Sequence, residues 1–247
     1  MIFNFLFAMK YYLLHLSFLI FLLQSCSDQT VSNLSSFYVS LDSLSTPKAY
    51  EFHQTNGVDT ALSHYWHISK REDSTQWLIE WERSDANFIP DMAITEQIVS
   101  NGVITKSYDF ISFDSSSQQY IHYPNQIKHA VVFPFDIPTD TNLVYRFECD
   151  FKIPPEFLMV KMVRDRKFTR FADEYVFGNK VRTAHFSITE FYDIEDKEKG
   201  GFWNQTKYKS EVYAEGYGLI RTIEKTDAGT ITQFLHRVYN LPDINKD

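Results

Sequence analysis

The sequence lacks the short motifs that identify common enzymes. It contains no Gly-x-Ser-x-Gly, no His-Glu-x-x-His, no phosphate-binding loop and no dinucleotide fingerprint. Positive charge is also scarce, with 24 Lys and Arg against 32 Asp and Glu and a net charge of −8. Nucleic-acid binding depends on clustered Lys and Arg, so we expect no nucleic-acid partner. We predict that the protein is not an enzyme and has no cofactor, metal ion or catalytic residue.

Long apolar runs are missing everywhere except at the N-terminus. Leu13 to Leu23 forms an apolar run after the basic residue Lys10 and ends in Leu23-Gln24-Ser25-Cys26. This layout is typical of an export signal that is cut after Ser25. It resembles a bacterial lipoprotein signal, in which an aliphatic and then a small residue precede the cysteine that receives the lipid. We predict residues 1–25 as the signal peptide and Cys26 as the lipidated first residue of the mature protein.

Two alternatives for this segment are a transmembrane helix and a signal that leaves no lipid. Met1 to Leu23 is long enough to span a bilayer, which takes about 20 apolar residues. Against a retained helix, Lys10 lies inside the run, and a start at Met9 would give a shorter signal. Ser27 follows Cys26, whereas the inner-membrane retention signal of enterobacterial lipoproteins has Asp there, so we predict delivery to the outer membrane, with the membrane as a partner through Cys26. This leaves open which side of that membrane the protein faces.

The other cysteine, Cys149, is predicted to be a buried structural thiol. A lipidated Cys26 leaves it no partner for a disulfide within the chain. In the segment Val144–Phe151, alternation places Cys149 on the same strand face as three aromatic residues. Free cysteine in such surroundings behaves as a small hydrophobic residue.

The rest of the chain divides into three parts. Residues 26–47 are rich in Ser and Thr and are predicted to form a tether behind the lipid, with an insert, Leu34 to Leu41, that can dock as an edge strand. Residues 48–240 form the predicted β domain, and residues 241–247 form a polar tail. Phe133 to Pro138 is predicted to be a loop between two halves of the sheet, because neither proline can donate to a strand ladder.

Alternating apolar and polar residues dominate residues 48–240. Trp77, Ile79 and Trp81 alternate with polar residues, which predicts a half-buried strand with those three on the core side. Asn101-Gly102 predicts a type I′ hairpin turn, and Asp227-Ala228-Gly229 predicts the last hairpin. The predicted strands are Leu62–Ser69, Thr75–Arg83, Ile94–Val99, Val103–Phe113, Gln119–Tyr123, Leu143–Phe151, Leu158–Phe171, Tyr175–Phe177, Val181–Tyr192, Thr206–Tyr213, Leu219–Lys225 and Thr230–Tyr239.

Short connections between these strands exclude a parallel sheet, which needs crossovers of a dozen or more residues. Aromatic residues make up 17% of the chain and suit a broad concave face. We predict an all-β fold, a single domain with an antiparallel, meandering, curved sheet that forms a half-open barrel.

The segment from Glu211 to Arg221 carries a second resemblance. Tyr213-Ala214-Glu215-Gly216-Tyr217-Gly218-Leu219-Ile220-Arg221 is similar to a segment of TapB-like bacterial lipoproteins. Those proteins resemble periplasmic carriers that localise lipoproteins, so the resemblance implies an antiparallel half-barrel with an apolar interior. Independently of the family, Gly216 and Gly218 are predicted to form a sharp turn in which a Cβ would clash.

Several titratable clusters have ordinary structural explanations. His64 and His67 lie three apart on a strand and so face opposite sides, which does not suit a shared metal ion. Glu80 and Glu82 share a face that we expect to be solvated. Four further histidines occur singly: His122, His129, His185 and His236.

Two charged segments complete this set. The acidic run from Asp193 to Glu198 lacks the spacing of a calcium loop and is predicted to be a solvated hairpin tip. Arg164, Arg166 and Arg170 share a strand face with Phe168. This face suits either an anionic ligand or lipid headgroup, or acids on neighbouring strands.

We therefore predict a lipid-anchored cell-envelope module whose apolar, aromatic concave face binds a lipid, a peptide or an envelope protein. The alternatives are a structural accessory subunit of an outer-membrane complex and a hydrolase with a nonstandard site. Three segments also resemble the Asp-Ser/Thr acceptor for O-glycans on exported Bacteroidota proteins: Asp42-Ser43-Leu44, Asp59-Thr60-Ala61 and Asp73-Ser74-Thr75.

Overall fold

The computed structural model describes residues 31–73, 76–138, 143–153 and 158–241. It is all-β apart from two short 3-10 helices, as predicted. The elements are β1 (Val31–Asn33), η1 (Ser35–Phe37), η2 (Asp42–Leu44), β2 (Lys48–Thr55), β3 (Thr60–Asp73), β4 (Gln76–Ser84), β5 (Pro90–Val99), β6 (Gly102–Asp114), β7 (Gln119–Pro124), β8 (Gln126–Pro134), β9 (Asp136–Pro138), β10 (Tyr145–Ile153), β11 (Leu158–Val176), β12 (Asn179–Asp196), β13 (Gly201–Ala214), β14 (Gly218–Thr226) and β15 (Gly229–Asn240).

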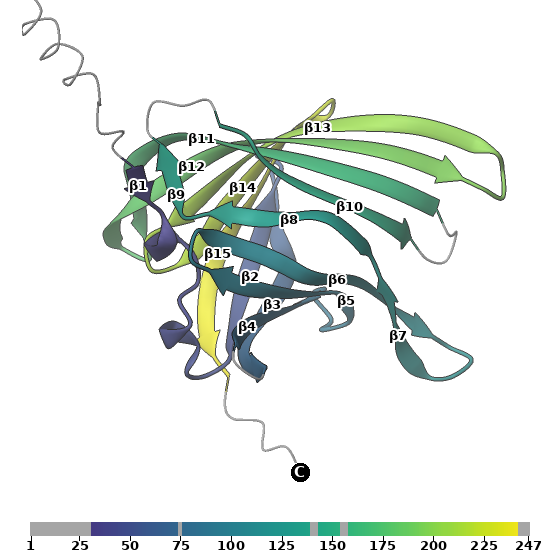
Figure 1. Ribbon diagram of the computed structural model, residues 1–247, viewed down its shortest axis with the longest axis horizontal. Coiled ribbons are helices and arrows are strands. Elements are labelled where there is room, and N and C mark those ends of the chain that lie inside the picture. The colour runs from purple at the N-terminus through teal and green to yellow at the C-terminus, as the bar shows by residue number, and fades with distance from the viewer. Residues whose placement is uncertain (1–30, 74–75, 139–142, 154–157, 242–247) are drawn as a thin grey trace, which may run out of the picture.

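Thirteen strands form one sheet in the order β5-β4-β3-β2-β15-β14-β13-β12-β11-β10-β8-β6-β7. A further pairing joins β5 to β6 and closes all of these described strands except β7 into a ring (Figure 1). Every strand pair in the sheet is antiparallel, which confirms the predicted antiparallel, curved, single-domain fold. β12 and β13 extend well beyond the ring as a long hairpin at the right of the view.

The ring is joined most weakly between β6 and β8. Only three residue pairs connect these strands, and the last of them sets Ile104 against Val131. Gly102 and Pro134 form the first pair, and a Cβ on Gly102 would lie 2.5 Å from the Phe133 carbonyl oxygen. The predicted hairpin is confirmed, but its type I′ turn is wrong, because the turn residues are Ser100 and Asn101 and neither has a positive φ. Gly102 begins β6 without a positive φ, and its lack of a side chain allows β8 to approach.

The barrel interior changes character along each strand. On β11 the inward residues run from Val160 and Met162, through Arg164 and Arg166, to Phe168. On β12 they run through Tyr192, Glu190, Ile188 and Phe186 in the opposite direction. In the register of the two strands, Arg164 lies opposite Glu190 and Phe168 lies opposite Phe186, while Arg166 lies opposite Ile188 and finds its acid, Glu211, on β13. A charged zone therefore separates two apolar clusters within one barrel.

The segment from Leu34 to Leu44 closes one end of the barrel, and we call it the N-terminal plug (purple in Figure 1). Its side chains Leu34, Phe37 and Leu44 are 1% exposed or less, as part of the larger apolar cluster. The predicted edge strand over Leu34–Leu41 is wrong, because this segment forms 3-10 turns and fills the barrel end. The edge strand lies just before it, where β1 pairs with β9.

The plug also changes the predicted tether. Residues 31–47 of that tether belong to the packed domain. Their apolar side chains, among them Leu34, Phe37 and Leu44, are buried in the core of the barrel. The remaining residues, 26–30, lie outside the described residues. They are too few to span more than about 18 Å even when fully extended.

Three further boundaries differ from the prediction. Phe133 to Pro138 is not a simple loop: it ends β8 and forms β9, and it buries Phe133, Phe135 and Ile137. β2 and β8 were not predicted as strands. The predicted strands at Leu158–Phe171 and Tyr175–Phe177 are one strand, β11, which reverses at Phe177-Gly178, both with positive φ.

The faces of β4 are less uniform than predicted. Ile79 is fully buried, but Trp77 is 44% exposed near the end of the strand, where Lys70 lies over its ring. Leu78 is buried on the opposite face. The last hairpin is as predicted, because Thr226 pairs with Gly229 across Asp227-Ala228.

Candidate functional site

A cavity of about 160 Å³ lies inside the barrel, beside the N-terminal plug. Its wall combines aromatic rings from β2, β3 and β4 with charged groups from β5, β11 and β13. The lining residues are Tyr38, Val39, Tyr50, Phe52, Trp66, Trp81, Ile94, Glu96, Val132, Arg164, Arg166, Glu211, Tyr213, Gly218 and Leu219. This volume resembles that of a core cavity of about 150 Å³ that binds benzene.

One side of the cavity is an aromatic corner. Trp66 and Trp81 meet edge to face with ring centroids 6.0 Å apart, and Tyr38 packs edge to face on Trp81 at 6.2 Å. The indole N–H of Trp81 is buried near Glu96, whose pKa it lowers, but it forms no hydrogen bond of normal geometry among the described residues. An unpaired buried donor costs free energy, so this N–H is a ready donor for a ligand or a water molecule.

Glu96 is the polar group of this corner. It is 5% exposed and accepts a hydrogen bond from the hydroxyl of Tyr38. Burial raises the pKa of Glu96 to about 7, despite the opposing effects of Tyr38 and Trp81. Glu96 therefore exists in both protonation states near neutral pH and can donate or accept a hydrogen bond in the cavity.

The opposite wall holds two ion pairs. Arg166 donates to Glu211 at 2.7 Å, and the hydroxyl of Tyr213 donates to the same carboxylate at 2.9 Å. Arg164 donates to Glu190, also at 2.7 Å. The predicted pairing of the basic face with acids on neighbouring strands is thus confirmed. Arg170 leaves this face because the β11–β12 pairing shifts register between Phe168 and Arg170.

The acids on this wall are held ionised. Burial raises the pKa of Glu190, but Arg164 and Lys209 outweigh it and lower the value to about 2. Lys209 lies 2.9 Å from Glu190, and Tyr192 donates a hydrogen bond to it. For Glu211, Arg166 and Arg164 likewise outweigh burial and lower the pKa. These groups are already satisfied by one another, which leaves Glu96 as the acid in the cavity without an ion-pair partner among the described residues.

The predicted glycine turn borders the cavity and supports the plug. Gly216 and Gly218 have φ of +79° and +80°, which confirms the sharp turn expected for them. The expected clash of a Cβ is wrong for Gly216, which has open space around it. The N–H of Gly216 donates to the carbonyl of Ser36 at 2.8 Å. A Cβ on Gly218 would lie 3.0 Å from a methyl group of Val39. Small size at Gly218 therefore allows the plug to lie against β14.

The histidines named from the sequence do not come together. His64 stacks on Phe52, and burial lowers its pKa to about 4, while His67 lies 3.3 Å from Ser84. The others are dispersed around the sheet: His122 lies near Asp109, His185 lies near Glu174, and His129 is exposed.

The remaining predicted groups behave as expected. Glu80 and Glu82 lie on the outer face, and Arg71 donates to Glu80. The acidic run ends β12 and forms an exposed turn in which Asp196 accepts backbone N–H groups from Glu198 and Lys199. Cys149 is buried, and burial raises the pKa of its thiol to about 12, so it is an inert core residue.

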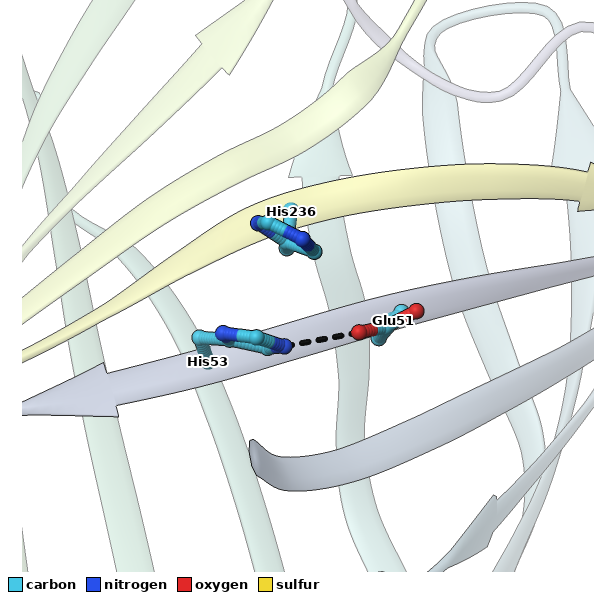
Figure 2. A group of neighbouring side chains, drawn as sticks. All are labelled: Glu51, His53 and His236. Atoms are coloured by element: carbon cyan, nitrogen blue, oxygen red, sulfur yellow. Dashed lines mark hydrogen bonds and ion pairs between the residues drawn. The ribbon is translucent and has the colours of Figure 1, made fainter. Parts of the chain in front are cut away.

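One cluster was missed from the sequence. Glu51 and His53 on β2 lie beside His236 on β15, on the outside of the barrel (Figure 2). The spacing Glu-x-His places two ligand types on one strand face and was the available signal. His236 could not be added from the sequence, because only the pairing of β2 with β15 brings it there.

Cys26 lies outside the described residues. Among the three predicted glycan sites, Thr60 is exposed at the start of β3, Ser43 is half-buried, and Ser74 lies outside the described residues. No helix in the described part of the chain is long and apolar enough to cross a membrane.

Comparison with solved structures relates the fold to two bacterial proteins. A candidate lipoprotein from Parabacteroides distasonis aligns over 82% of this chain and 98% of its own, with a TM-score of 0.50 and 11% identity. A candidate exported protein with a YmcC-like fold from Bacteroides fragilis covers 78% of this chain and 95% of its own, with a TM-score of 0.48 and 9% identity. The first likeness supports the fold.

No family model and no curated protein sequence matches the chain. The TapB-like resemblance of residues 211–221 therefore stays a prediction.

Proposed function

We propose that this protein is an exported, lipid-anchored envelope protein that binds a small ligand inside its barrel. The cavity beside the plug carries this proposal. Its size suits one apolar group about as large as a benzene ring, and Trp66 and Trp81 offer that group a rigid aromatic surface. Glu96 supplies a hydrogen-bonding group whose charge changes near neutral pH.

The ligand chemistry follows from the two walls. Arg164 and Arg166 are already paired with carboxylates, so the cavity does not offer a free cation for an acidic group. Glu96 can accept a hydrogen bond from a hydroxyl or an amine on the ligand. We propose an amphiphilic ligand with an apolar end and a donor group, which a lipid or a peptide of the envelope can present.

Lipid anchoring at Cys26 is the second part of the proposal. If Cys26 carries lipid, the few residues between it and β1 hold the plugged end of the barrel close to the membrane. Labelling of cells with an alkyne fatty acid tests this part. Label should appear on the wild type and be lost in Cys26→Ser, and an unlabelled wild type would contradict it.

Native mass spectrometry tests the binding function. Val132 lines the cavity, while its neighbour Val131 is 40% exposed. We expect the wild type and Val131→Phe to carry a small molecule, and Val132→Phe to lose it because the larger ring fills the cavity. Equal occupancy in both variants would place the ligand elsewhere. A wild type that carries no ligand, and whose melting temperature is unchanged by benzylamine or toluene, would count against binding in the cavity.

A further inference from the structure

The outside of the barrel carries a compact group of metal-ligand side chains where β2 meets β15. Glu51, His53 and His236 each offer one ligand atom, and these atoms all lie within 4.8 Å of one another. The two imidazole rings are stacked with centroids 4.0 Å apart, and Figure 2 shows both rings beside the carboxylate. Two imidazoles and a carboxylate are a common ligand set for zinc.

A β-bulge creates this grouping. Leu235 pairs with Phe52 and Arg237 pairs with Glu51, so His236 is an extra residue on β15. A bulge of this kind re-aims a side chain, and here it brings His236 over the ring of His53. The backbone of both strands is fixed by pairing on either side, so the three residues stay close together before any ligand arrives.

The carboxylate is the buried member of the group. Glu51 is 8% exposed, and its two oxygens have different partners. Oε1 lies 2.7 Å from Nε2 of His53, while Oε2 accepts a hydrogen bond from the hydroxyl of Tyr239. Tyr239 therefore orients Glu51 from behind, as outer residues do for metal-binding carboxylates.

We propose that Glu51, His53 and His236 bind one divalent transition-metal ion of the zinc class. Zinc bonds of about 2.0 to 2.2 Å in a tetrahedral site place ligand atoms about 3.3 Å apart, which small side-chain rotations reach from the observed arrangement. His236 is exposed, so the fourth position faces solvent. Calcium and magnesium prefer sites made of oxygen atoms and fit this set poorly.

This site is separate from the cavity. Tyr50 and Phe52 on β2 line the cavity, whereas Glu51 and His53 alternate with them and point to the other side of the same strand. The metal proposal and the ligand-binding proposal can therefore fail independently.

Titration of the purified full chain in detergent with zinc chloride tests the proposal. We expect one zinc ion per chain, reversible with a chelator, and visible absorption bands of a four-coordinate site when cobalt replaces zinc. His53→Gln and His236→Gln should each weaken zinc binding by more than about tenfold, and Tyr239→Phe by about tenfold. Calcium at the same concentration should not bind.

His122→Gln is the matched control. His122 also has a carboxylate partner, Asp109 at 3.7 Å, but it is not part of a three-ligand group in the described chain. We expect its zinc affinity to equal that of the wild type. Circular dichroism checks that each variant is folded. No stoichiometric zinc, or equal affinity in the wild type and in a folded His236→Gln variant, would overturn the proposal.

Discussion

Glu96 and Glu190 face the interior of the same barrel, and both are almost completely buried, at 5% and 1% exposed. Burial raises the pKa of Glu96 to about 7, where Tyr38 is its hydrogen-bond donor. Burial acts on Glu190 too, but Arg164 and Lys209 bring its pKa down to about 2. Because the two carboxyl groups are buried to nearly the same extent, their pKa values differ through their partners: Glu190 has two cations and Glu96 has a tyrosine hydroxyl.

This contrast distinguishes two walls of the barrel interior. The charged groups of the β11–β13 wall are paired with one another, whereas the polar groups of the wall beside the plug are available to a ligand. On the β11–β13 wall, Glu190 and Glu211 are each paired with an arginine, so these groups stabilise one another and have little left to offer a ligand. Beside the plug, the carboxyl of Glu96 has no ion-pair partner among the described residues, and the nearby indole N–H of Trp81 forms no hydrogen bond of normal geometry. Perturbed groups of this kind tend to mark functional sites.

Breaking an ion pair on the β11–β13 wall should have the largest effect. Arg166→Met removes the cation and leaves Glu211 buried without its partner, so we expect a loss of about 3 to 5 kcal/mol in the free energy of unfolding. Urea denaturation measures this loss. Arg146→Met is the control, because Arg146 pairs with Asp165 at the surface and its side chain is 54% exposed. It should cost much less than Arg166→Met, because solvent screens an exposed ion pair. Equal costs would mean that the buried pair is no more important than the exposed one.

The sequence accounts for much of this wall. Alternation predicts that Arg164 and Arg166 share a face, and the surplus of acids predicts that they are neutralised. It does not say which acids do so. Asp165 is adjacent in the chain but points to the outer face and binds Arg146. Glu190 and Glu211 reach the arginines only through the register of β11, β12 and β13, which depends on pairing over the whole sheet.

The other wall was much harder to predict. Tyr38 lies in a serine-rich segment whose composition favours a tether, and the alternation of Phe37, Val39 and Leu41 points to an edge strand and not to a plug. Their burial depends on a barrel end of matching shape, which no local pattern encodes. Glu96 was not singled out at all, because an isolated acid in a strand gives no sign of its depth in the fold.

An intermediate effect is expected from disturbing the plug. Gly218→Val combines a positive φ with a β-branched side chain and a contact of 3.0 Å to Val39, the neighbour of Tyr38. We expect a loss of about 2 to 3 kcal/mol in the free energy of unfolding. Gly216→Ala has the same φ but open space around its Cβ, so it should cost about 1 kcal/mol. Chemical denaturation compares the two, and an unchanged midpoint for Gly218→Val would show that the plug does not depend on this close approach.

The smallest effect, and the most direct test of the contrast, is expected from Glu96→Gln. The folded protein holds the proton of Glu96 up to about pH 7, while the unfolded chain releases it near pH 4.5. Between these values the folded state binds more protons, so the wild type loses stability as the pH rises.

Glutamine at position 96 does not titrate and keeps an acceptor for the hydroxyl of Tyr38. We therefore expect the stability difference to move in favour of Glu96→Gln by about 2 kcal/mol between about pH 5 and pH 8, since one pKa unit corresponds to about 1.4 kcal/mol. The weaker hydrogen bond accepted by the amide lowers the stability of the variant by the same amount at every pH. Glu190→Gln should show the opposite trend, because the fold lowers the pKa of Glu190. The wild type gains stability as the pH rises from about 2 to about 4.5, and the variant lacks that gain. If the stability difference between Glu96→Gln and the wild type did not vary with pH, Glu96 would be ionised like Glu190. The two walls of the barrel would then be alike, and the cavity would lose the acid on which its proposed ligand chemistry depends.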